Sequence, residues 1–243
     1  MANRPTVVLG CKVLERLLGD RLAPGLPVTW MDIRLHNTPR KLGAALQEEL
    51  DALPEPANVV IGYGLCGNGL VGVRAGPHTL IVPRTHDCVA IFLGSHQRYV
   101  QRFFANPNTY YLTKGWLDAF DEPLTDYLDY VKEFDQETAD YLVEMKYKHY
   151  RKLCMVGFSQ EELDAARPAA MKVADFCRER LGMAYEEIIG TSELIDGLVR
   201  MTGQVDPQDD AFVVVPPGGE IVAELFMRPG DAPPVTSRAE RDR

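Results

Sequence analysis

The chain has 243 residues, 46% of them hydrophobic, with 26 Lys plus Arg against 35 Asp plus Glu, a composition that excludes disordered and collagen-like proteins. No apolar run is long enough to cross a bilayer, and the first apolar segment is too short for a secretion signal, so we expect a cytoplasmic protein without a membrane partner. Residues 1–120 hold 12 basic and 9 acidic side chains, whereas residues 121–243 hold 14 and 26. The sequence shows no clustered basic surface, and we therefore predict no nucleic-acid partner.

Short apolar strands alternate with helical patterns along the first hundred residues. The strands are expected to end at Leu9, Leu35, Gly62 and Val82, and helical spacing of apolar residues follows the first, second and fourth. Because nearly every residue in these strands is apolar, the pattern is typical of parallel strands covered on both faces. The sequence therefore predicts an α/β fold of three layers, a mostly parallel sheet with helices on both faces.

The remaining elements follow the same alternation more loosely. Four further strands are predicted at residues 108–113, 151–158, 184–190 and 211–218. Helices are predicted at about 125–150, at 160–181 and at 192–203. We interpret residues 1–228 as one α/β domain. Residues 229–243 lack apolar periodicity and are predicted to be a disordered tail.

Reactive side chains follow the predicted parallel strands. Cys11 comes after the first strand, His36 after the second, Cys66 after the third, and His86 and Cys88 after the fourth. Since the carboxyl ends of parallel strands share one edge, these residues should meet there. Thiolates with an imidazole are the ligands of zinc, and a mostly cysteine set suits an iron–sulfur cluster.

The alternative for each of these cysteines is a small buried core residue, since cysteine is among the most buried residue types. We assign that structural role to Cys154, within a strand-like run, and to Cys177, within a helix-like run. An odd count of five cysteines in an intracellular chain also argues against a disulfide framework.

Glycines gather where the third strand ends. Gly62, Gly64, Gly67 and Gly69 would allow close backbone approach and positive φ, as in a nest of N–H groups around an anion. Arg84, fixed after a proline, is the expected anion holder. The segment also fits G-x-G-x-x-G, but no acidic residue follows at the spacing of a dinucleotide site. A tight turn needed only for packing is the other interpretation.

Two roles remain open for the residues after the fourth strand. Asp87 could orient His86 as a carboxylate partner of a metal ligand. Cys66 or Cys88 could instead be a nucleophile served by His86 and Asp87, although no nucleophile-elbow pattern supports that arrangement.

Three segments, GYGLCGNGLVGV, VPRTHDCVAIFLGS and NTYYLTKGWL, together resemble the DUF1638 family, over about residues 5–220. The family pattern matches this chain at eight positions: Cys66, Asn68, Arg84, His86, Asp87, Cys88, Gly115 and Trp116. The family has no assigned activity. Its members tend to be encoded near corrinoid-dependent methyltransferases and one-carbon proteins, so the resemblance implies a corrinoid or methyltransferase protein as partner.

The first function class is therefore a metalloprotein that assists corrinoid-linked methyl transfer. Its metal ligands would be Cys11, Cys66, Cys88 and either His86 or His36, holding zinc or an iron–sulfur cluster. A small anionic or thiol ligand would contact the following residues: Gly64, Gly67, Asn68, Gly69, Arg84, Asp87 and Trp116. The second class is a metal-free module that binds a small anion or serves as an accessory protein, and a Cys-nucleophile enzyme is the third.

Overall fold

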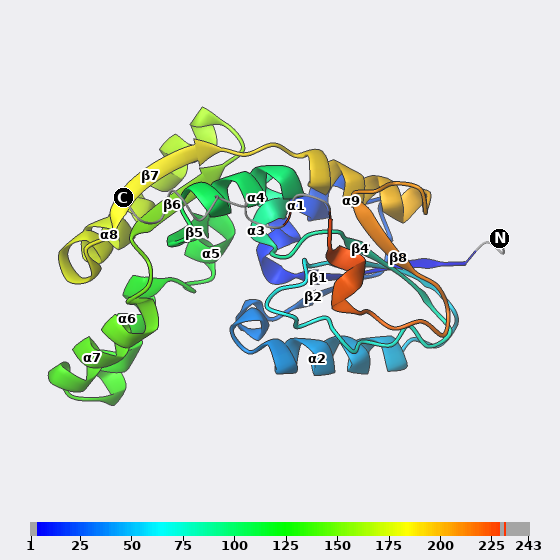
Figure 1. Ribbon diagram of the computed structural model, residues 1–243, viewed down its shortest axis with the longest axis horizontal. Helices are drawn as coiled ribbons and strands as arrows, with labels where there is room; N and C mark the ends of the chain where they lie inside the picture. The colour runs from blue at the N-terminus through cyan, green and yellow to red at the C-terminus, as the bar shows by residue number, and fades with distance from the viewer. Residues whose placement is uncertain (1–3, 229–230, 232–243) are drawn as a thin grey trace, which may run out of the picture.

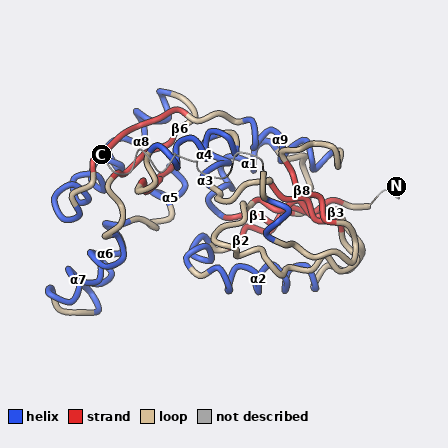
Figure 2. Tube along the Cα trace, in the orientation of Figure 1, coloured by secondary structure: helices blue, strands red, loops and turns tan. Residues whose placement is uncertain are grey.

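Five strands form the first sheet, in the order β2-β1-β3-β4-β8 (Figures 1 and 2). The computed structural model describes residues 4–228 and 231, without the side chains of His36 and Asn37. The first four strands are parallel, and β8 runs antiparallel beside β4. The bounds are Thr6–Cys11 for β1, Val28–Met31 for β2, Asn58–Gly62 for β3, Thr79–Pro83 for β4 and Phe212–Val215 for β8.

Helices cover both faces of this sheet. In Figure 1, α2 (Pro39–Asp51) runs along one face, and α9 (Glu193–Gly203) lies with α1 (Glu15–Leu18) on the other. The inner side of α2 presents Leu42, Leu46 and Leu50 at intervals of four residues, and all three are buried. This spacing places them on one side of the helix, so the apolar stripe is what holds α2 against the sheet.

The second sheet contains β5, β6 and β7 in that order, all parallel. The strands span Thr109–Thr113, Lys152–Gly157 and Ala184–Ile189. The long helix α8 (Gln160–Leu181) packs on β6 and β7, and α6 (Pro123–Glu133) and α7 (Gln136–Tyr147) pack together beside it. The other helices are α3 (Val89–Leu93), α4 (His96–Ala105) and α5 (Lys114–Asp118), and the short 3-10 turns are η1 (Lys12–Leu14), η2 (Gly19–Arg21), η3 (Ile33–Asn37) and η4 (Ala223–Phe226).

The α/β prediction with mostly parallel strands is confirmed, and all eight predicted strands exist. The first, third and fourth end within two residues of the predicted positions. The second was predicted too long, because it stops at Met31 rather than near Leu35. There the Asp32 side chain accepts a hydrogen bond from the Arg34 N–H, and this interaction starts the η3 turn in place of further strand.

Two differences concern how the elements are joined. The strands divide into two sheets, because β8 occupies the edge of β4 while β5 pairs with β6. The predicted helix after the fourth strand is broken into α3 and α4 at Gly94, whose φ of 95° ends α3 in the left-handed conformation. Within the described residues, no helix is long and apolar enough to cross a membrane.

Candidate metal centre

The loops that leave β3 and β4 run side by side at the carboxyl edge of the first sheet. The N–H of Leu65 donates to the carbonyl of Thr85 at 2.9 Å, and the N–H of Cys66 donates to the carbonyl of His86 at 3.0 Å. A Cβ on Gly64 would lie 2.7 Å from the carbonyl carbon of Asp87, so only glycine permits this approach. The predicted convergence of the two loops is confirmed.

Three buried cysteines, Cys11, Cys66 and Cys88, are neighbours at this edge of the sheet. The Cys88 thiol interacts with the Cys66 thiol, and this hydrogen bond together with burial raises the pKa of Cys88 well above its usual value. Burial raises the pKa of Cys11 to about 12, and Tyr63 and Cys66 are among its neighbours. In this state Cys11 and Cys88 are therefore protonated at neutral pH, whereas a metal-bound cysteine is a thiolate.

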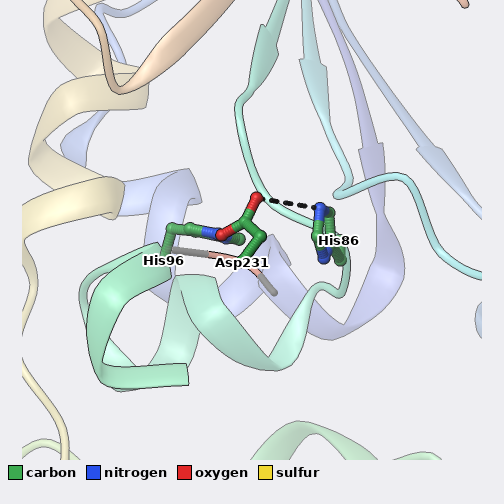
Figure 3. Close-up of side chains that lie close together, drawn as sticks. All are labelled: His86, His96 and Asp231. Atoms are coloured by element: carbon green, nitrogen blue, oxygen red, sulfur yellow. Dashed lines mark hydrogen bonds and ion pairs between the residues drawn. The ribbon is translucent and has the colours of Figure 1, made fainter. Parts of the chain in front are cut away.

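His86, His96 and Asp231 form the cluster with the spacing of metal ligands, as Figure 3 shows. One ligand atom from each lies within 4.8 Å of the other two. The Nε2 atom of His96 is 2.6 Å from Asp231 Oδ1, and the Nε2 atom of His86 is 3.5 Å from Asp231 Oδ2. The imidazole rings meet edge to face, with centroids 5.0 Å apart. Both nitrogens thus face one carboxylate.

Each ligand comes from a different segment. His86 lies in the loop after β4, His96 is the first residue of α4, and Asp231 follows η4 near the end of the chain. Asp231 is held locally, because its Oδ2 accepts the N–H of Arg228 at 2.7 Å. The side chains of His96 and Asp231 are both 5% exposed and that of His86 is 33% exposed, so two of the three side chains are shielded from water.

The His86 Nε2 atom is buried without a hydrogen-bond partner, since the 3.5 Å contact with Asp231 does not meet hydrogen-bond geometry. A buried polar nitrogen in this condition costs about 1–3 kcal/mol, so something else is expected to satisfy it. A metal ion between the two imidazoles and the carboxylate would do so.

Ionisation in the cluster agrees with metal binding. Burial lowers the pKa of His96, and this effect outweighs the opposing influence of Asp231. Burial raises the pKa of Asp231, but the hydrogen bonds with His96 and with the N–H of Arg228 outweigh it, so the net shift of the pKa is downward. A neutral imidazole beside an ionised carboxylate is the form in which both residues bind metals.

The predicted four-residue site of Cys11, Cys66, Cys88 and His86 is not assembled. Among the residues that the structure describes, no set of three ligand atoms within 4.8 Å includes a cysteine. His86 instead lies against Asp231 and the ring of His96. The side chain of His36 lies outside the described residues.

A model of one protein family, described as a protein of unknown function (DUF1638), matches residues 30–199. The chain belongs to the DUF1638 family. No curated protein and no solved structure matches it. The part shared with DUF1638 contains His86 and His96, whereas Asp231 lies beyond its end and Cys11 before its beginning.

The sequence analysis missed two of the three clustered residues in this DUF1638 chain. His96 carries no motif, and its role follows from the break at Gly94, which turns α4 back toward the loop after β4. Asp231 lies inside residues 229–243, which were predicted to be disordered, yet it is a described residue with two partners. The other residues of that range, 229–230 and 232–243, lie outside the described part of the chain.

The predicted ligand-contacting residues are distributed over separate places. Gly67, Asn68 and Gly69 line a groove of about 850 Å³ against α2. Asp87 and Trp116 line a different pocket of about 240 Å³. Arg84, predicted as an anion holder, forms an ion pair with Asp210 at 2.5 Å, because β8 brings that carboxylate beside it.

Proposed function

We propose that this protein binds a divalent transition metal through His86, His96 and Asp231. The observation that supports this best is the meeting of these three ligand atoms within 4.8 Å, one of them a buried nitrogen without a hydrogen-bond partner. Ligand atoms bonded to one ion at about 2.0–2.2 Å lie up to roughly 4 Å apart, so a small side-chain adjustment accommodates the ion.

Two histidines and one carboxylate favour zinc or iron(II) over an iron–sulfur cluster. Iron–sulfur clusters are held mainly by thiolates, whereas this cluster offers nitrogen and oxygen. Three protein ligands also leave coordination positions for a substrate or water, as in catalytic zinc sites and in non-haem iron enzymes. The ion would act there as a Lewis acid.

The family resemblance supports a further step, in which the metal assists corrinoid-linked methyl transfer. Zinc bound to a small thiol holds it as the thiolate, which is the form that accepts a methyl group. A corrinoid or methyltransferase protein would then supply that group. The test is to add methylcobalamin and a small thiol to zinc-loaded protein and to follow demethylation by absorbance, with metal-free protein as control.

Metal titration tests the site itself. Protein stripped with a chelator and then freed of it is titrated with Co²⁺, whose absorption bands report coordination, and bound Zn²⁺ is measured by elemental analysis. We expect one ion per chain in the wild type. His86→Ala, His96→Ala and Asp231→Asn should each lower the affinity at least about 100-fold, since each removes a ligand.

Matched variants separate this site from the cysteines. His149→Ala and Asp129→Asn alter exposed residues of the same types and should leave metal binding unchanged. Cys66→Ser and Cys88→Ser should also retain the ion. Loss of metal in the cysteine variants, with normal binding in the histidine variants, would show that the cysteine thiolates bind the metal instead.

Anion binding is the second candidate function, supported by the groove beside α2. Gly67 and Asn68 both have left-handed φ, of 61° and 66°, and the arginines Arg40 and Arg74 line the same groove. This combination suits a phosphate or carboxylate. Phosphate titration of the wild type and of Arg40→Gln tests it without any metal present.

A further inference from the structure

A second pocket, distinct from the metal cluster, opens between α4 and β5 and has a volume of about 240 Å³. Six aromatic side chains line it: Tyr99, Phe103, Tyr110, Tyr111, Trp116 and Tyr150. Asp87 and Cys88 contribute to the same wall. A pocket of this volume suits a ligand smaller than a typical drug molecule.

The rings come from four parts of the chain and are fixed against one another. Tyr99 and Phe103 stand four residues apart on α4, with ring centroids 6.1 Å apart. Tyr110 of β5 meets Tyr150 edge to face, with centroids 5.2 Å apart at 90°. Trp116 comes from α5 and is 6% exposed. A ligand inside the pocket would therefore meet aromatic rings from several directions.

The charge within this pocket is negative. Among the lining residues that the structure describes, Asp87 carries a charge and no lysine or arginine takes part. Burial and then Asp87 raise the pKa of Tyr99 and of Tyr150, while Lys146, which does not line the pocket, lowers that of Tyr150. Arg102 touches the Tyr111 hydroxyl at 3.4 Å but does not line the pocket, and Glu186 pairs with it and with Lys152.

We propose that this pocket binds a small methylated ammonium cation. Aromatic faces attract a cation through the negative charge of the ring face, and several rings with one carboxylate are how proteins recognise quaternary ammonium groups. An anion is disfavoured by Asp87 and by the ring faces. A neutral apolar ligand would bring no positive charge to the half-buried carboxylate, which has, among the described residues, only the Val89 N–H as a hydrogen-bond donor to its side chain.

The first test compares a cation with its uncharged isostere. Protein freed of metal is titrated by calorimetry with tetramethylammonium, choline and 3,3-dimethyl-1-butanol, the last having a carbon in place of the choline nitrogen. We expect saturable binding of one cation per chain and an affinity about tenfold lower for the isostere. Equal binding of choline and the isostere, or no saturable binding, would overturn the proposal.

Variants then place the cation in this pocket. Asp87→Asn removes the charge while the amide oxygen can still accept the Val89 N–H, now 2.9 Å from Asp87 Oδ1. Asp87→Asn and Tyr99→Leu should each weaken choline binding about three- to thirtyfold, and Tyr99→Phe should preserve it. Tyr141→Leu, at a side chain 61% exposed outside the pocket, is the control. If Tyr99→Leu and Tyr141→Leu behave alike, the cation binds elsewhere and the proposal is wrong.

Discussion

Thr85 is the residue that orients His96. Its fully buried hydroxyl lies 3.2 Å from the Nδ1 atom of His96 and donates to the carbonyl of Asp87 at 3.4 Å. A metal bound at Nε2 would leave the ring proton on Nδ1, where the Thr85 hydroxyl oxygen accepts it and so holds the ring in place. Without a metal, the Nε2–H of His96 donates to the Asp231 carboxylate at 2.6 Å.

Replacement of Thr85 by valine should therefore weaken metal binding although Thr85 touches no metal. We expect Thr85→Val to lower Co²⁺ affinity about 10–100-fold, since the His96 ring loses its orienting partner. Thr202→Val is the matched control, because the Thr202 hydroxyl also donates to a carbonyl, that of Val199 at 2.7 Å, on the distant helix α9. Equal affinities of the two variants would show that Thr85 does not orient the ligand.

Cys154 and Cys177 are core residues, as predicted, and both are fully buried. Cys177→Ser places a hydroxyl among apolar neighbours and should reduce the free energy of unfolding by about 1–3 kcal/mol. Cys154→Ser should cost less, because Glu186 and Arg102 lie within hydrogen-bonding reach of that position. Urea unfolding of the two variants measures the difference. A larger loss for Cys154→Ser would contradict this assignment.

At the scale of elements, one ion network ties α4 to the second sheet. Glu186 of β7 pairs with Arg102 of α4 and with Lys152 of β6, the latter at 3.0 Å. Burial raises the pKa of Glu186, but the hydrogen bonds of Lys152 and Cys154 and the charge of Arg102 outweigh it, so the net shift is downward. The ionised carboxylate therefore stabilises the fold.

This shift predicts a pH-dependent effect of Glu186→Gln. A carboxyl group whose pKa is lowered on folding contributes stability above its unfolded pKa of about 4.3, and loses it as the pH falls through the folded value. At pH 7 the variant should be less stable by about 1 kcal/mol, a modest figure because the groups are partly exposed. The unfolding midpoints of the wild type and of Glu186→Gln should differ at pH 7 and agree at pH 3. A difference of the same size at both pH values would show that the substitution acts through packing and not through charge.

The strands could be predicted from the sequence because their apolar runs are local signals. The pairing of β8 with β4, and hence the division into two sheets, depends on contacts between residues about 130 positions apart, such as Leu80 and Val215. No local pattern encodes that choice.

The candidate site could be predicted only in part, for the same reason. The loops after β3 and β4 met as expected because parallel strands end at one edge. The partner of His86 could not be found from spacing, since Asp231 is 145 residues away in a segment without apolar periodicity. A ligand supplied by such a segment leaves no periodic signal in the sequence.

At the scale of the whole molecule, close backbone contacts join the two sheet regions. A Cβ on Gly190, which follows β7, would lie 1.9 Å from the carbonyl oxygen of Phe92 in α3. A Cβ on Gly115 of α5 would lie 2.7 Å from the carbonyl of Val13. Both approaches require glycine. The absence of a side chain at Gly190 lets the end of β7 lie against α3, and its absence at Gly115 lets α5 lie against η1.

Asp231 completes the metal cluster, so a residue beyond Arg228 is part of the candidate site. A chain ending at Arg228 lacks Asp231, whereas one ending at Asp231 keeps all three ligands. We expect the shorter chain to lose Co²⁺ affinity by at least about 100-fold, as Asp231→Asn does in the full chain, and the longer one to bind like the wild type. Thermal midpoints should change little, because Met227, Arg228 and Asp231, the described residues after Phe226, are not among the core residues. If the chain ending at Arg228 binds Co²⁺ normally, Asp231 is not a ligand and any carboxylate ligand must come from elsewhere. The two histidines are then tested by their own variants.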